Sequence, residues 1–130
     1  KYQEFKKVNC EIYAISTDTH FAHKTWHDIS KNISKIEYPM IGDPTHSLTY
    51  DFDVFDENDG LAQRGSFIID PEGKIVVYEV NAGNVGRNAD ELLRRLHACQ
   101  FVYEHGDNVC PAKWKLGEKT IQTTIENIGK

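Results

Sequence analysis

The strand pattern in residues 11–16 limits the choice of fold more than any other part of the sequence. Ile12 and Ala14 alternate with Tyr13 and Ile15, so a strand formed here is apolar on both faces. Such a strand is typical of the interior of a parallel sheet that helices cover on both sides. Because unpaired buried backbone groups are costly, it needs hydrogen-bonded neighbours on both sides. We therefore expect an α/β fold that is N-terminally incomplete, with at least one further strand before the first residue.

Local signals place the other elements around this strand. Capping residues, Pro at a first helical position and helical spacing of apolar residues predict helices at residues 2–8, from Asp18 or Thr19 to about Asn32, from Asp43-Pro44 to about Tyr50, and from Asn88 to about Tyr103. Two strands, Gly65–Asp70 and Lys74–Val80, flank a Pro-Glu-Gly turn. This order of elements resembles much of a thioredoxin-like sandwich.

Charge, hydropathy and cysteine usage exclude several classes of protein. The net charge of −5 is spread along 130 residues without a basic stripe, so nucleic acid is not an expected partner. No apolar run approaches the ~20 residues that a membrane helix needs. The three cysteines are an odd number without the dense spacing of a secreted disulfide scaffold, which favours a reducing cytoplasm. An odd number also allows a cysteine whose partner lies elsewhere.

The stretch His105-Gly-Asp-Asn-Val-Cys-Pro-Ala-Lys-Trp114 is the most specific motif in the chain. It resembles the resolving-cysteine segment of typical two-cysteine peroxiredoxins, and by this resemblance Cys110 is the resolving cysteine. Residues 16–27 and 61–73, and Gly86-Arg87 before a Leu-rich helix, are similar to the bacterial alkyl hydroperoxide reductase branch of that family. The alternative is an incidental cysteine in an exposed tail.

The resemblance implies a thiol peroxidase that needs no cofactor. An attacking thiolate reduces hydrogen peroxide or an organic hydroperoxide and becomes a sulfenic acid, which condenses with Cys110 to an intersubunit disulfide. A disulfide reductase flavoprotein or a thioredoxin-like donor then reduces this disulfide. The family carries its attacking cysteine in a Thr-x-x-Cys motif, which these residues lack. We therefore expect the C-terminal part of such an enzyme, inactive by itself, in which Cys10 and Cys99 are structural thiols.

Two arginines are further candidates for the catalytic site. Arg64 stands where the family places an arginine beside the attacking sulfur, where a cation favours the thiolate and its guanidinium can hold the peroxide oxygens. Arg87 resembles a second arginine of the same site. The alternatives are a strand-end salt bridge for Arg64 and a surface ion pair for Arg87.

The resemblance also predicts domain organisation and assembly. Residues 1–103 are expected to be part of the peroxiredoxin domain, and residues 104–130 to be an arm that carries the resolving cysteine to a partner subunit. The strand Lys74–Val80 resembles the edge through which two subunits form a dimer, and five dimers then form a ring through a surface around Phe21 and Ala22.

Two other functions stay open. The chain could act only as an assembly or binding module. It could also bind a metal through His20, His23 and His27, which share one helical face.

Overall fold

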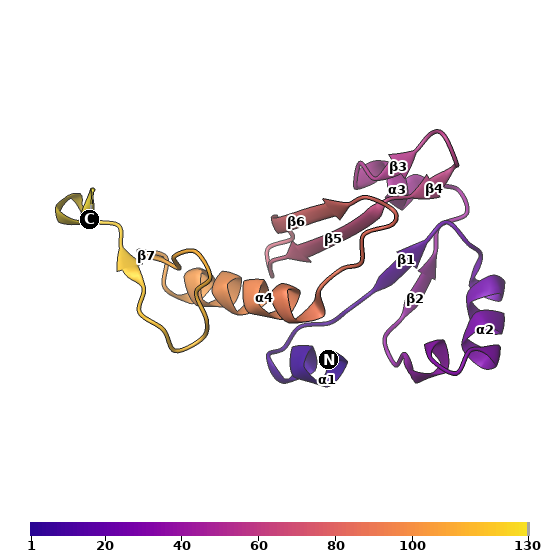
Figure 1. Cartoon of the computed structure of the whole chain (residues 1–130), viewed down its shortest axis with the longest axis horizontal. Helices are drawn as coiled ribbons and strands as arrows, with labels where there is room; N and C mark the ends of the chain where they lie inside the picture. Colours follow the sequence, from indigo (N-terminus) through magenta and orange to yellow (C-terminus); the bar gives the residue numbers. More distant parts are fainter. Residues whose placement is uncertain (130) are drawn as a thin grey trace. The chain divides into compact units, whose positions relative to one another are not determined.

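The computed structural model describes residues 1–129, and Lys130, the last residue of the predicted arm, lies outside the described residues. The chain divides into two compact units, one of residues 1–66 with 78–87 and the other of residues 67–77 with the chain from Asn88 onward. In chain order (Figure 1) the elements are α1 (Tyr2–Lys7), β1 (Ala14–Ser16), α2 (His20–Ile29), η1 (Ile33–Lys35), β2 (Met40–Gly42), α3 (Ser47–Asp51), β3 (Phe55–Asp56), β4 (Leu61–Ala62), β5 (Arg64–Ile69), β6 (Ile75–Asn81), α4 (Ala89–Glu104), β7 (Asn108–Val109), β8 (Ile121–Gln122) and η2 (Ile125–Asn127).

The first unit contains the predicted βαβ crossover. β1 and β2 are parallel, with Ala14 opposite Met40 and Ser16 opposite Gly42, and α2 lies between them in the chain. Gly42 allows the end of β2 to approach the start of α2, because a Cβ there would lie 2.7 Å from the carbonyl oxygen of Asp18. A parallel pair joined by a helix confirms the α/β class that residues 11–16 predicted.

The predicted cover on both faces of β1 is absent from the described residues. β1 pairs with β2 alone. On one face Tyr13 is 59 % exposed and Ile15 is 40 % exposed. Ile12 and Ala14, on the other face, are partly buried. The further strand expected beside β1 therefore stays a prediction.

The cap predicted for α2 is confirmed. The Oγ1 atom of Thr19 accepts a hydrogen bond from the backbone N–H of Ala22 at 3.2 Å. The helix ends at Ile29 rather than at Asn32, because Ser30 is extended and its hydroxyl accepts from the N–H of Ile33, which starts a separate 3₁₀ turn. The predicted start of the next helix, α3, differs from the observed one.

The prediction that α3 begins at Pro44 was wrong. Pro44 and Thr45 form a turn closed by a 3.0 Å hydrogen bond from the N–H of His46 to the carbonyl of Asp43. His46 then takes the left-handed conformation, with φ of 62°, so a continuous helix cannot pass through it and α3 begins at Ser47. The side chain of Asp43 still caps α3, because its carboxylate accepts hydrogen bonds from the N–H groups of Leu48 and Thr49.

Asp43 is a buried carboxylate, 4 % exposed, that should make stability depend on pH. Burial alone would raise its pKa, but hydrogen bonds from the N–H groups of Leu48 and Thr49 and from the Thr49 hydroxyl outweigh this, and the pKa is lowered. A pKa that is lower in the folded state adds stability above the unfolded-state value of about 4, which is lost as the pH falls through the folded-state pKa.

We expect Asp43→Asn to lower the free energy of unfolding at pH 7 by roughly 1–3 kcal/mol, because an amide cannot satisfy all three donors. Urea unfolding at pH 7 and at points between pH 5 and 3 checks this, since the variant should lose less stability than the wild type on acidification. Asp51→Asn, at an exposed position of the same helix, is the matched control. Equal effects of the two substitutions would contradict this role for Asp43.

The hairpin of β5 and β6 was predicted from its turn and is confirmed. The carboxylate of Asp70 accepts from the N–H groups of Glu72 and Lys74, both at 2.9 Å, and Gly73 supplies the positive φ of 84°. The polar residues 57–60 form the turn between β3 and β4. In the described residues, no helix has the length and apolar character needed to cross a membrane.

Candidate functional site

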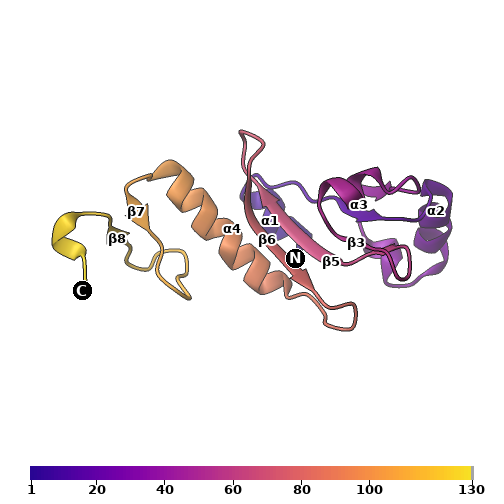
Figure 2. The ribbon, with the colours of Figure 1, turned by 90° about the horizontal axis from the view of Figure 1, so that it is seen from above.

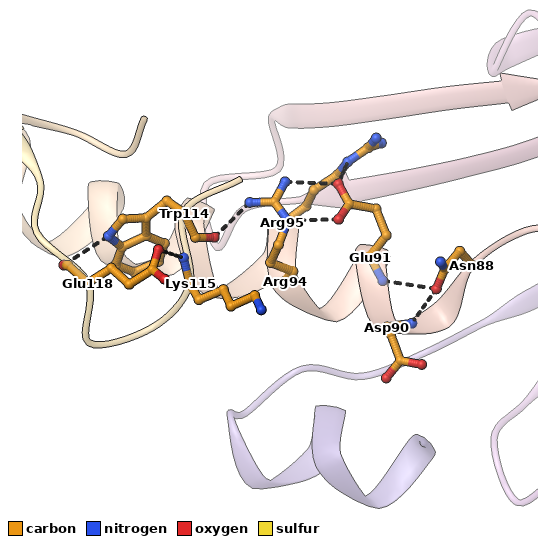
Figure 3. A network of polar contacts seen from close by, with 8 residues as sticks. All are labelled: Asn88, Asp90, Glu91, Arg94, Arg95, Trp114, Lys115 and Glu118. Atoms are coloured by element: carbon orange, nitrogen blue, oxygen red, sulfur yellow. Dashed lines mark hydrogen bonds and ion pairs between the residues drawn. The ribbon is translucent and has the colours of Figure 1, made fainter. Parts of the chain in front are cut away.

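α4 is the element on which the Cys110 segment is built. The side chain of Asn88 caps it by accepting from the N–H groups of Asp90 and Glu91 at 3.0 and 3.1 Å, as the sequence predicted (Figure 3). Leu93 and Leu96, one turn apart on the predicted apolar stripe, are buried. The cap and the buried leucines stabilise α4, and the residues that follow the helix can pack against it.

The described part of the predicted arm that follows α4 (residues 105–129, here called the arm) folds back against α4 around Trp114. β7 and β8 pair as a short antiparallel hairpin near the C-terminal end of α4 (Figure 2). Trp114 is 1 % exposed, and its ring lies 5.2 Å from the ring of Phe101, measured between centroids. The indole N–H donates to the carbonyl of Glu118 at 3.0 Å. Trp114 is therefore the apolar anchor that holds the arm against α4.

A polar clamp made of Glu91, Arg94 and the carbonyl of Trp114 adds a second attachment (Figure 3). The Nε and Nη2 atoms of Arg94 donate to the two carboxylate oxygens of Glu91 at 2.7 and 2.8 Å, and Nη1 donates to the Trp114 carbonyl at 2.8 Å. Arg95 also donates to Glu91, at 2.9 Å. The hydrogen bond from Arg94, together with that from Arg95, lowers the pKa of Glu91 to about 2, so the carboxylate stays charged far below neutral pH.

Cys110 is a partly buried free thiol within the docked arm. Its Sγ lies 3.9 Å from the carbonyl oxygen of Ala98, on the surface of α4. Burial raises the pKa of Cys110, and the charge of Arg94 opposes this increase. Cys99, the next residue of α4, has a pKa raised by burial and by the nearby Cys110. Docked in this way, Cys110 is mainly protonated and is a weaker nucleophile than a free cysteine.

Arg64 and Arg87 lie together at the open end of the β5–β6 hairpin, in the first unit. The Nε of Arg64 donates to the carbonyl of Gly83 at 3.5 Å, and Nη1 of Arg87 donates to the carbonyl of Gly65 at 3.0 Å. Both side chains are exposed, and in the described residues neither has an acidic partner. Each guanidinium therefore keeps most of its donors available for a ligand.

The remaining cysteine and the three histidines make separate contacts. Cys10 is partly buried, and burial raises its pKa. His23 is buried with Nε2 2.6 Å from the Ser16 hydroxyl, His27 contacts the carbonyl of Ile36, and His20 lies against the ring of Phe21. Within residues 1–129 no three His, Cys, Asp or Glu side chains are grouped so as to hold a metal ion.

The clamp is the part of this region that sequence reasoning missed. The i, i+3 spacing of Glu91 and Arg94 is visible in the sequence, but it is typical of exposed helical ion pairs. The hydrogen bond from Arg94 to the carbonyl of Trp114 joins residues 20 positions apart, and no local sequence pattern predicts it. The only available signal was the Trp that ends the motif around Cys110.

Comparisons with known proteins find similar peroxiredoxin sequences along the whole chain. The AhpC/TSA family model matches residues 1–78, and the model of the C-terminal domain of 1-Cys peroxiredoxin matches residues 98–128. Alkyl hydroperoxide reductase C of Escherichia coli strain K12 is 50 % identical over 99 % of this chain and 69 % of its own length. The same enzyme of Bacillus subtilis strain 168 is 49 % identical over 100 % of the chain and 70 % of its own length.

Solved structures similar to this chain are also peroxiredoxins. The crystal structure of Enterococcus faecalis AhpC has a TM-score of 0.82 and 52 % identity, and the match covers 85 % of this chain and 66 % of that one. The reduced 2-Cys peroxiredoxin of Plasmodium vivax has a TM-score of 0.90 and 29 % identity, covering 95 % and 65 %. The chain thus spans about two thirds of the length of the proteins it matches.

Proposed function

The chain belongs to the AhpC/TSA family of peroxiredoxins, and we propose that it is the resolving part of a thiol peroxidase that reduces hydrogen peroxide and alkyl hydroperoxides. The observation that carries this proposal is the complete resolving-cysteine motif around Cys110, in a chain that matches alkyl hydroperoxide reductase C along 99 % of its length. The free, partly buried thiol of Cys110 on a docked arm supports it.

The proposed cycle conserves atoms and electrons. The thiolate attacks one peroxide oxygen, so that an S–O bond forms, the O–O bond breaks and the sulfur becomes a sulfenic acid. The displaced alkoxide or hydroxide takes up a proton and leaves as the alcohol or water. Cys110 then attacks that sulfur, which forms a disulfide and releases water. A dithiol donor, either a disulfide reductase flavoprotein or a thioredoxin-like protein, reduces the disulfide to two thiols. The attacking cysteine belongs to residues outside these 130.

Arg64 and Arg87 are the proposed binding groups for the peroxide. Each has one hydrogen bond to a main-chain carbonyl, which orients the guanidinium and leaves further N–H groups for the peroxide oxygens. A cation at this position also lowers the pKa of the attacking thiol. The exposure of both side chains and the absence of an acidic partner within residues 1–129 favour this role over the alternatives, which are a strand-end salt bridge for Arg64 and a surface ion pair for Arg87.

The proposed enzyme is a homodimer joined through β6, and five dimers form a ring. Residues 1–103 are its peroxiredoxin domain and residues 104–130 its resolving arm, which forms the disulfide with the other subunit. Support comes from the apolar side chains that β6 exposes, including Tyr78 at 73 %, and from exposed Phe21 on α2 at the expected ring contact. Free thiols at all three cysteines fit a cytoplasmic location.

The first experiment is intact mass spectrometry of the purified protein without reductant, followed by hydrogen peroxide turnover with dithiothreitol. We expect a chain of these 130 residues alone to show no turnover, because it lacks the Thr-x-x-Cys motif. A protein that carries the same residues with the attacking cysteine should turn over. Turnover by the 130-residue chain would overturn this account and move the attacking role to Cys10 or Cys99.

A further inference from the structure

The clamp joins α4 to the arm at a single guanidinium. Arg94 uses two of its N–H groups on Glu91 and a third on the carbonyl of Trp114. The side chains of Arg94 and Glu91 are only 25 and 35 % exposed, so the ion pair is partly shielded from water. Charge-assisted hydrogen bonds in such a setting are stronger than those between neutral groups.

We propose that Arg94 is a positioning residue for Cys110: held by Glu91, it fixes the carbonyl of Trp114 and keeps the arm docked on α4 with the Cys110 thiol against the Ala98 carbonyl. The meaning of this docking for catalysis rests on the proposed function, in which Cys110 resolves the sulfenic acid. The docking itself follows from the contacts of Arg94 and can be tested without peroxide.

An arginine is required at this position by geometry. The guanidinium fork places two parallel N–H groups on the Glu91 carboxylate and directs a third toward Trp114 at the same time. A lysine has a single ammonium on a flexible stem and cannot reproduce this arrangement. The buried ring of Trp114 holds the arm through apolar contacts, and the clamp holds it through polar ones. The strength of the clamp therefore sets how often the arm separates from α4 at the Trp114 carbonyl.

The clamp also controls how reactive Cys110 is. While the arm is docked, burial keeps the Cys110 thiol largely protonated, although the nearby charge of Arg94 partly offsets this. Cys99 also lies near Cys110, which raises the pKa of the Cys99 thiol. Opening the clamp exposes the thiol and removes the effect of burial, so an undocked arm carries a more reactive Cys110.

The test measures alkylation of Cys110 by iodoacetamide in the full, reduced protein from pH 6 to pH 10. Cys99 and Cys110 fall on one tryptic peptide, residues 96–113, so fragment ions assign the modified sulfur. We expect Arg94→Met and Glu91→Gln to increase the Cys110 rate at pH 7.5 by about five- to tenfold and to move the midpoint of the pH profile down toward the ordinary value of about 8.5. Arg94→Lys should be intermediate.

Two controls separate positioning from a general loss of structure. Lys115→Ala removes an exposed positive charge from the arm and leaves the clamp intact, so its Cys110 rate should stay within about twofold of the wild type. Cys10 lies in the first unit, and its alkylation rate should not change in any variant. An unchanged Cys110 rate in Arg94→Met would overturn the proposal, as would an equal increase at Cys10. Either result leaves peroxide turnover, and thus the proposed function, to be judged separately.

Discussion

Replacing Cys110 by serine is expected to reduce peroxide turnover at least about 100-fold when recycling depends on a disulfide reductase, because a hydroxyl cannot form the disulfide that the reductase recognises. The substitution removes one sulfur from a partly buried position and should leave the fold intact. With dithiothreitol the loss should be much smaller, since a small thiol can reduce the sulfenic acid directly. Steady-state assays of the full protein with the two reductants measure this difference.

Cys99→Ser is the matched control for this prediction. Cys99 lies close to Cys110 and is partly buried like it, but the motif of the resolving segment does not include it. Its variant should keep wild-type turnover with both reductants and still form a peroxide-induced disulfide dimer on a non-reducing gel. The Cys110→Ser variant should form no such dimer. A loss of turnover in Cys99→Ser with full activity in Cys110→Ser would move the resolving role to α4.

The elements predicted correctly are those whose hydrogen bonds are made within a few residues. Thr19 and Asn88 cap their helices through N–H groups two or three positions away, and Asp70 closes its turn within four. Their energetics depend on residue types that are adjacent in the sequence. A single amino-acid sequence therefore locates these elements well.

The start of α3 and the docking of the arm depend on conformations that composition does not reveal. Asp43-Pro44 is an ordinary helix start, but the left-handed His46 interrupts it, and Asp43 caps the helix from further away. The arm has the Gly, Pro and charge content of a tail, but the burial of Trp114 against Phe101 fixes it. The cap of α3 uses hydrogen bonds that span five and six residues, further than an ordinary helix cap. The docking of the arm is set by tertiary contacts, which outweigh local propensity.

The candidate site was predicted from motifs rather than from physical periodicity. Cys110, Arg64 and Arg87 came from the resemblance to a family. The contacts that orient them, to Ala98, Gly83 and Gly65, are to main-chain carbonyls. Any residue type supplies such a carbonyl, so no sequence pattern could have predicted these partners. Their catalytic roles stay predictions.

Arg64→Met is expected to lower kcat/KM for hydrogen peroxide in the full protein by roughly 10²–10³, the size of effect seen when a preorganised charge donor is removed from a reacting oxygen. The loss has two physical sources. Without the cation the attacking thiol is less ionised at neutral pH, and the peroxide loses a guanidinium that binds its oxygens as charge develops. Arg64→Lys keeps the charge and should recover part of the first effect only.

Stopped-flow oxidation at pH 5 to 9 distinguishes these two sources. If the cation acts through thiol ionisation, the rate of Arg64→Met recovers as the pH rises, whereas a loss of peroxide binding persists at every pH. Lys74→Met, in the exposed β5–β6 turn, is the control for charge. The bond from Arg64 to Gly83 is long at 3.5 Å and exposed, so its removal should change the free energy of unfolding by less than about 0.5 kcal/mol. Unchanged kcat/KM in a variant of wild-type stability would exclude Arg64 from the site and leave Arg87 as the candidate cation.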